Sequence, residues 1–189
     1  AAMVYALCEY KKSVRPVPRT IRFLGTCDEE KGGIGAREIL KEVPEASIGT
    51  LLIGEPTGCR LGVAQKGCLW LEIEAHGKTS HGAYPQEGCN AVEQAMALAG
   101  EIETYVKSFT HPVLGASTAQ VTQISGGVAP NMTPDTCRIL MDIRMTPGLT
   151  SQMVVGQAEA FAAARSVTSE EKFRVSCRIV NDRRAIEIG

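Results

Sequence analysis

The sequence predicts a mixed α/β protein, in which part of one α/β domain is followed by a smaller, complete domain. Residues 1–65 alternate helical and strand-like segments, which is typical of a parallel α/β layer. Residues 66–181 show strand and helix patterns in the order β-α-β-β-α-β of a ferredoxin-like sandwich. With 189 residues and 44% apolar composition, the chain is long enough for one ordinary domain or two small ones.

The first part supplies two expected helices and two expected strands. The helices are "AAMVYALCEYKK" (1–12), which has an apolar face, and "GAREILKEV" (35–43). Buried strands are expected at "RTIRFLGT" (19–26) and "GTLLIG" (49–54). Two strands do not make a stable parallel sheet, and the first helix starts at residue 1 without a capping residue. We therefore expect residues 1–65 to belong to a longer α/β domain.

The second part supplies the ferredoxin-like unit. "CLWLEIEAHG" (68–77) alternates apolar and polar side chains, which predicts a half-buried strand. A long amphipathic helix, two strands joined by a Gly/Pro/Asn-rich turn, a second helix capped by Ser151 and a last strand follow. Residues 182–189 are expected to start the return to the first domain. The later segments are 88–109, 117–127, 135–144, 151–166 and 172–180.

Charge and composition exclude several classes of partner. The 20 basic and 21 acidic side chains leave no concentrated basic surface, so no nucleic-acid partner is expected. No apolar run approaches the length of a membrane span and the first residues show no signal-peptide pattern, so we expect a cytoplasmic protein without membrane contacts. The seven cysteines are odd in number and include no C-x-x-C pair, which argues against a disulfide framework or a thiolate zinc site.

Four acidic residues follow the two expected strands of the first part. Asp28, Glu29 and Glu30 come after the first strand, and Glu55 comes after the second. Ligands of open α/β sheets bind at the carboxyl ends of the strands. Carboxylates that converge there repel one another unless a cation lies between them, which points to a divalent metal site. The alternative is a solvated cluster that caps the following helix, and the residues alone leave both interpretations open.

Two loops and a strand of the second part carry further candidates. "GKTSHGAYPQEGCNA" (77–91) places His81 in a turn-rich loop, where it either serves a site or is an exposed spectator. Asn90 is placed to cap the next helix. "SGGVAPNMTPD" contains Asn131, which either presents its amide to a ligand or is an ordinary turn residue. Arg144 either pairs with a substrate carboxylate or forms a surface ion pair.

Together these stretches resemble the M20-type metallopeptidase and deacylase family, which includes acetylornithine deacetylase, succinyl-diaminopimelate desuccinylase, aminoacylase-1 and glutamate carboxypeptidase. Four motifs carry the resemblance, in family order over residues 23–144: "DEE", "GEPT", G-K-x-S-H-x-A-x-P-x-x-G-x-N and "GGVAPNMTPD…DIR". The resemblance implies a zinc-peptidase-like α/β catalytic domain, interrupted by a ferredoxin-like lid and dimerisation domain.

The resemblance also implies an activity. The expected reaction is metal-dependent hydrolysis of the amide bond of N-acyl amino acids or small dipeptide-like substrates. The expected cofactors are two divalent metal ions, with zinc favoured and cobalt or manganese as alternatives. The expected partner is a second copy of the chain, which pairs through the lid domain.

The motif positions imply a role for each candidate residue. Glu29 would be the general base, and Glu30 and Glu55 would each bind one metal ion. His81 would stabilise the oxyanion in the active site of the partner subunit. Asn131 and Arg144 would bind the carboxylate end of the substrate. Asn90 would have a loop-fixing or substrate-side role.

These 189 residues depart from the family pattern in one respect. The family's His-x-Asp motif, bridging aspartate and C-terminal metal-binding histidine have no counterpart, because none of His76, His81 and His111 fits those positions. We therefore expect a central segment that neither holds two metals nor turns over substrate. The alternative hypothesis is a non-catalytic ferredoxin-like dimerisation or ligand-binding module whose acidic clusters are solvated surface.

Overall fold

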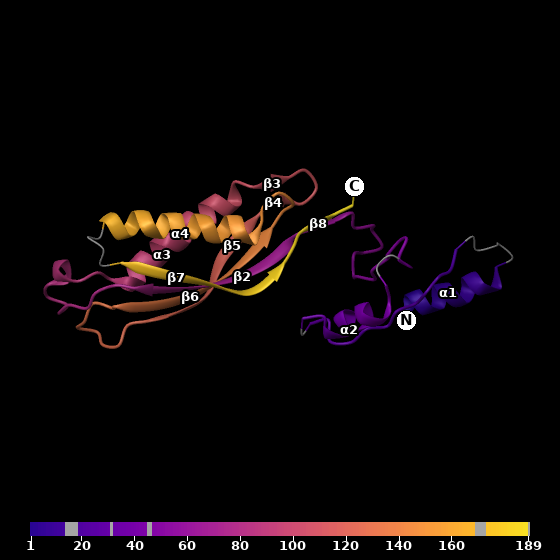
Figure 1. Cartoon of the computed structure of the whole chain (residues 1–189), viewed down its shortest axis with the longest axis horizontal. Helices are drawn as coiled ribbons and strands as arrows, with labels where there is room; N and C mark the ends of the chain where they lie inside the picture. Colours follow the sequence, from indigo (N-terminus) through magenta and orange to yellow (C-terminus); the bar gives the residue numbers. More distant parts are fainter. Residues whose placement is uncertain (14–18, 31, 45–46, 169–172, 189) are drawn as a thin grey trace. The chain divides into compact units, whose positions relative to one another are not determined.

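The structure is a computed structural model that describes residues 1–13, 19–30, 32–44, 47–168 and 173–188. It divides into two compact units, Ala1–Arg60 and Leu61–Gly189. The first unit contains two helices, α1 (Ala2–Lys12) and α2 (Ile34–Glu42), which confirm the two helices predicted there (Figure 1). Neither helix contains a buried residue.

The two strands predicted in the first unit are not formed. Residues 19–26 and 49–54 are fully described and carry no regular secondary structure. Their apolar side chains are exposed: Phe23 keeps 48% and Ile53 65% of their accessible surface. A strand needs neighbours for its backbone groups and a covering layer for its apolar side chains, and two strands alone supply neither. The prediction of buried strands is wrong for this structure for that reason.

The second unit is built on a four-stranded antiparallel sheet. Across the sheet the order is β5 (Thr118–Gly126), β6 (Thr136–Met145), β2 (Gly67–His76) and β7 (Arg174–Arg183). Two helices, α3 (Ala91–Lys107) and α4 (Ser151–Thr168), cover one face of this sheet (Figure 1). The chain order β2-α3-β5-β6-α4-β7 confirms the predicted ferredoxin-like unit.

Alternation along the central strands decides which face is buried. Leu69, Leu71 and Ile73 of β2 point to the helices and are fully buried, whereas Trp70 between them is exposed. Burial of each such aliphatic side chain contributes about 1.5–3 kcal/mol. The same alternation in β6 and the inward face of α3 complete the core, whose further members include Ile139, Met141, Ile143, Leu98 and Ile102, and whose largest fully buried side chain is Phe173.

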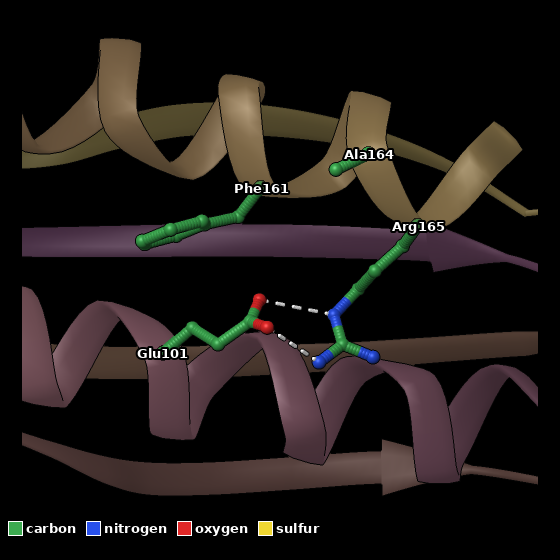
Figure 2. Close-up of a pocket in the computed structure, with 4 residues that line it drawn as sticks. All are labelled: Glu101, Phe161, Ala164 and Arg165. Carbon is green, nitrogen blue, oxygen red and sulfur yellow. Dashed lines mark hydrogen bonds and ion pairs between the residues drawn. The ribbon is translucent and has the colours of Figure 1, made fainter. Parts of the chain in front are cut away.

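The two helices are joined by an ion pair on their outer side. Figure 2 shows Arg165 of α4 extending toward Glu101 of α3, next to Phe161 and Ala164. Arg165 Nε donates to Glu101 Oε2 at 3.1 Å, and a second guanidinium nitrogen donates to the side-chain carbonyl of Gln94 at 3.1 Å. The pair links the two helices, and the shallow pocket beside it is lined by the paired Glu101 and Arg165 together with Phe161 and Ala164.

Helix α4 does not start with the predicted cap. Ser151 Oγ donates instead to Asp182 Oδ2 at 2.6 Å, which ties the start of α4 to β7. The preceding Thr150 accepts from the Met153 N–H at 3.3 Å, which is the geometry of an N-cap. The cap lies one residue earlier than the sequence predicts, because the two hydroxyl residues are adjacent and either one can cap.

Several short elements complete the second unit. They are the pair β1 (Ala64–Gln65) and β8 (Ile186–Glu187), the pair β3 (Thr110–His111) and β4 (Gly115–Ala116), and a 3₁₀ turn over Pro85–Glu87. His111 Nε2 lies 3.0 Å from Glu187 Oε1, and Lys66 Nζ donates to the Ala116 carbonyl. No helix among the described residues is long and apolar enough to cross a membrane.

Candidate functional site

The acidic motif of the first unit forms a tight turn before α2. The Gly33 N–H donates to the carbonyls of Asp28 and Glu29, at 3.0 and 3.1 Å. Asp28 has a φ of 56°, a left-handed conformation that Asp tolerates better than most residues. The carboxylates of Asp28, Glu29 and Glu30 are therefore presented by a closed turn, and all three residues are exposed.

The carboxylates of this turn do not cap α2. The N-cap is Gly33, with no side-chain hydrogen bond, and the first turn of the helix contains no acidic residue. Glu55 lies in a separate exposed turn, in which its carbonyl accepts from the Thr57 N–H at 2.8 Å. The capping interpretation is therefore wrong for this turn.

The acidic residues also do not converge. Within the described parts of the chain, no group of three His, Cys, Asp or Glu side chains lies close enough to hold a metal ion. The two strands whose ends were expected to bring these carboxylates together are not formed. The donor set in this structure does not fit a two-metal centre, and the roles of Glu29, Glu30 and Glu55 stay predictions.

The second unit does bring two predicted residues together. The loop with His81 and the loop with Asn131 meet in an antiparallel β-bridge between His81 and Met132. The Gly82 N–H donates to the Asn131 carbonyl at 2.8 Å, and a Cβ on Gly82 would lie 3.1 Å from the same oxygen. The motif glycine after His81 therefore permits the close approach of the two loops.

The His81 ring is oriented by its own turn. The Ala83 N–H donates to His81 Nδ1 at 3.1 Å, so this nitrogen is an acceptor and the neutral ring carries its proton on Nε2. The Tyr84 ring lies 6.2 Å from it, centroid to centroid, and His81 is exposed. The ring thus offers an N–H donor to whatever approaches the loop, which is the group that an oxyanion requires.

Asn90 confirms the interpretation as a helix cap. Its side-chain oxygen accepts from the N–H groups of Val92 and Glu93, at 3.0 and 3.3 Å, and so begins α3. The adjacent Ala91 N–H donates to the Pro134 carbonyl at 2.8 Å, which places the helix start against the Asn131 loop. The oxygen of Asn90 is committed to the helix.

Arg144 lies at the far end of the sheet from these loops. In the register of the sheet, Arg144 of β6 lies opposite Cys68, near the start of β2. The Asn131 loop precedes Thr136, at the other end of β6. At about 3.3 Å per residue, Arg144 and Thr136 are about 26 Å apart along the strand. Within one subunit the structure therefore does not bring Arg144 to His81 and Asn131.

The guanidinium of Arg144 is also already paired. It donates to both carboxylate oxygens of Asp142, at 2.7 and 2.9 Å, and Trp70 Nε1 donates to the same carboxylate at 3.1 Å. The hydrogen bonds to Asp142 raise the pKa of Arg144 above its usual value. This is the surface ion pair that was the alternative for Arg144, on the face of the sheet opposite the helices.

One pair of residues at the site was not predicted. Thr133 is only 8% exposed, and its Oγ1 lies 2.7 Å from Ser80 Oγ. The Thr133 N–H also donates to the Ser80 carbonyl at 2.9 Å. A contact between residues 53 positions apart leaves no periodicity in the sequence. Its only signal is that Ser80 and Thr133 each lie within one of the quoted motifs.

Comparisons with known proteins point to one family. Residues 63–170 match the peptidase dimerisation domain of M20 type. A probable carboxypeptidase of Aspergillus clavatus is 33% identical over 155 residues, which cover 78% of this chain and 37% of the relative. An acetylornithine deacetylase of Myxococcus xanthus is 31% identical over 173 residues, with 85% and 43% covered. The chain thus spans about two fifths of the length of these two relatives.

A solved structure agrees on the fold. The aminobenzoyl-glutamate utilization protein of Klebsiella pneumoniae superposes with a TM-score of 0.51 at 20% identity, over 64% of this chain and 30% of that one. The match of the dimerisation domain covers more than half of the chain and includes the His81 and Asn131 loops. The chain belongs to the M20 peptidase family.

Proposed function

We propose that the chain is the central part of a metal-dependent hydrolase that cleaves the amide bond of N-acyl amino acids or small peptide-like substrates. Residues 66–181 would be its lid and dimerisation domain, and residues 1–65 and 182–189 would belong to its catalytic domain. The relatives named carboxypeptidase and acetylornithine deacetylase support this proposal, because both names describe hydrolysis of a carbon–nitrogen bond in an acylated amino acid or peptide.

The observation that carries the proposal is the junction of the His81 and Asn131 loops. Each loop contains a family motif, and the backbone hydrogen bond from Gly82 to Asn131 holds them side by side. In the proposed reaction, His81 donates its Nε2–H to the oxyanion that forms when the amide carbonyl is attacked. The Asn131 amide would hold the carboxylate end of the substrate. Glu30 and Glu55 would contribute to holding divalent metal ions in the longer protein, and such ions would supply a water of lowered pKa.

Assembly is part of the proposal. The dimerisation domain supports a homodimer in which His81 of one subunit serves the active site of its partner. The candidate contact surfaces are helix α3 and the two outer strands of the sheet, β5 and β7. Within the described residues, each of these two strands has one edge without a neighbouring strand. The general base Glu29 would then act on the same substrate as the partner subunit's His81.

A substrate panel tests the proposal. The native gene product with its flanking sequences is incubated with N-acetyl and N-succinyl amino acids and with dipeptides, and amine release is measured. We expect hydrolysis that depends on a divalent metal, and a loss of about 100-fold or more in kcat for His81→Ala. The matched control is His76→Ala, because His76 is another exposed histidine, lies just before the motif that begins at Gly77, and has its Nε2 3.8 Å from Glu74 Oε1 of the same strand.

The alternative function is a non-catalytic dimerisation or ligand-binding module. The observation in its favour is that the candidate acidic residues Asp28, Glu29, Glu30 and Glu55 are exposed and that the described residues contain no metal-binding group. If the native product hydrolyses nothing in the panel with Zn²⁺, Co²⁺ or Mn²⁺ present, this alternative replaces the hydrolase. For the 189-residue chain alone, we expect no turnover and fewer than two bound metal ions per chain.

A further inference from the structure

The residue that stands out at the loop junction is Thr133. Its neighbour Met132 and the candidate residue Asn131 are both exposed, whereas Thr133 is buried. Its hydroxyl lies against the hydroxyl of Ser80, which immediately precedes His81. Buried hydroxyl groups that lack a partner destabilise a fold, so the two groups satisfy each other at a place that water reaches poorly.

The Ser80 side chain is confined on its other side as well. A Cβ on Gly88 would lie 2.5 Å from Ser80 Oγ and 2.7 Å from the Lys78 carbonyl. Because Gly88 has no side chain, the Ser80 hydroxyl can occupy this space. The Ser80 hydroxyl therefore lies between the backbone of Gly88 and the hydroxyl of Thr133.

The hydroxyl pair completes a set of three contacts between the two loops. The other two are backbone hydrogen bonds, from the Thr133 N–H to the Ser80 carbonyl and from the Gly82 N–H to the Asn131 carbonyl. They flank the bridge between His81 and Met132. Of these three contacts, the hydroxyl pair is the one between side chains. We call the three contacts together the clasp.

We propose that Thr133 is a positioning residue, which acts through the Ser80 hydroxyl to hold the His81 loop at a fixed place relative to the Asn131 loop. The importance of this placement for hydrolysis rests on the function proposed above. The clasp itself is a property of the two loops and holds with or without that function. The Thr133 hydroxyl contacts Ser80 Oγ, so its proposed effect on His81 is indirect.

The Gly82 N–H is the reporter that separates positioning from local packing. It donates to Asn131, two residues from Thr133, so it responds only if the hydroxyl pair couples the two loops. The chain also offers a matched control. Ser117 and Thr146 form a second hydroxyl pair at 2.8 Å, both residues are fully buried, and they lie beside the opposite end of β6.

The test is amide hydrogen exchange by NMR on the 189-residue chain. In Thr133→Val, which keeps the shape and removes the hydroxyl, we expect the Gly82 amide to exchange about five- to tenfold faster, since one net hydrogen bond is lost from the local opening equilibrium. Thr133→Ser restores the hydroxyl and should restore the slow exchange. Thr146→Val should leave Gly82 unchanged once rates are corrected for global stability.

Three results would overturn the proposal. They are unchanged exchange at Gly82 in Thr133→Val, equally fast exchange in Thr133→Ser, and equal acceleration in Thr146→Val. If Thr133→Val does not fold, Ser80→Ala removes the same hydroxyl pair from the less buried side, and the same expectation at Gly82 applies to it.

The function and the clasp fail separately. If Gly82 responds as expected but His81→Ala leaves hydrolysis by the longer native product unchanged, the clasp stands and the proposed function is wrong. If hydrolysis requires His81 but Gly82 does not respond to Thr133→Val, the function stands and Thr133 is not a positioning residue.

Discussion

Substitution of Asn90 separates its two interpretations, as a helix cap and as a substrate-side residue. Asn90→Ala removes the acceptor of the Val92 and Glu93 N–H groups at the start of α3. Loss of an Asn cap costs about 0.5–2 kcal/mol, and we expect about 1–2 kcal/mol here because two N–H groups lose their acceptor, one of them in a part-buried hydrogen bond. For a cooperative unit of this size, that corresponds to a fall of about 3–10 °C in Tm.

The assay is urea unfolding of the 189-residue chain, followed by circular dichroism at 222 nm. Asn90→Asp and Asn90→Ser are the controls, because both side chains cap helices about as well as Asn. We expect both to stay within about 0.5 kcal/mol of the wild-type free energy of unfolding. A destabilisation by Asn90→Asp as large as that by Asn90→Ala would refute the reasoning, and so would an Asn90→Ala variant as stable as the wild type.

The remaining predictions concern glycines and cysteines. Gly77→Ala would place a Cβ 2.1 Å from the Cys89 carbonyl oxygen, so we expect the free energy of unfolding, measured in urea, to fall by about 1–3 kcal/mol or more. A Cβ on Gly100 in α3 meets no atom within 4 Å, so Gly100→Ala should raise the free energy of unfolding by about 0.5–1 kcal/mol. Burial raises the pKa of Cys177 from 9.0 to about 11, so the folded state keeps a proton that the unfolded state releases. Stability should therefore fall as pH rises from about 9 to about 11, and Cys177→Ala should lose less stability over that range; equal urea midpoints for the wild type at pH 8 and pH 10.5 would contradict this. In thiol labelling of the native chain, the exposed Cys8, Cys27 and Cys59 should react first. Slow labelling of any of these three would count against the structure.

The second unit could be predicted from the sequence because its signals are local. Alternation in β2 and the apolar stripe of α3 each determine an element and the face that it buries. The order of these elements then selects the ferredoxin-like arrangement. The pairs β1–β8 and β3–β4 could not be predicted, since two-residue strands carry no periodicity.

The first unit shows the limit of such patterns. The apolar runs at 19–26 and 49–54 have the composition of buried strands, but burial depends on partners that a run of residues does not contain. The metal interpretation of Glu29, Glu30 and Glu55 was built on those strand ends and depends on the same missing neighbours. A pattern predicts that a segment is suited to a sheet, and the sheet itself requires the other strands.

At the candidate site, the sequence located the loops but not their contacts. His81 and Asn131 were found through motifs, and the structure joins their loops by a β-bridge. Arg144 was grouped with them because it follows in the next strand, yet the length of β6 separates it from both loops. A few residues of extended strand span a large distance in space. Motifs that are close in sequence can therefore lie at opposite ends of a strand, and their order alone does not define one site.

Mixed dimers of the native gene product test whether His81 of one subunit and Glu29 of the other serve one active site. The measurement is hydrolysis of the best N-acyl substrate after His81→Ala and Glu29→Gln subunits, each inactive alone, are unfolded and refolded together. Random assembly of a two-fold dimer makes half of the dimers mixed, each with one intact site of two, so the account predicts recovery of about a quarter of the wild-type rate. A mixture no more active than either variant alone would contradict it.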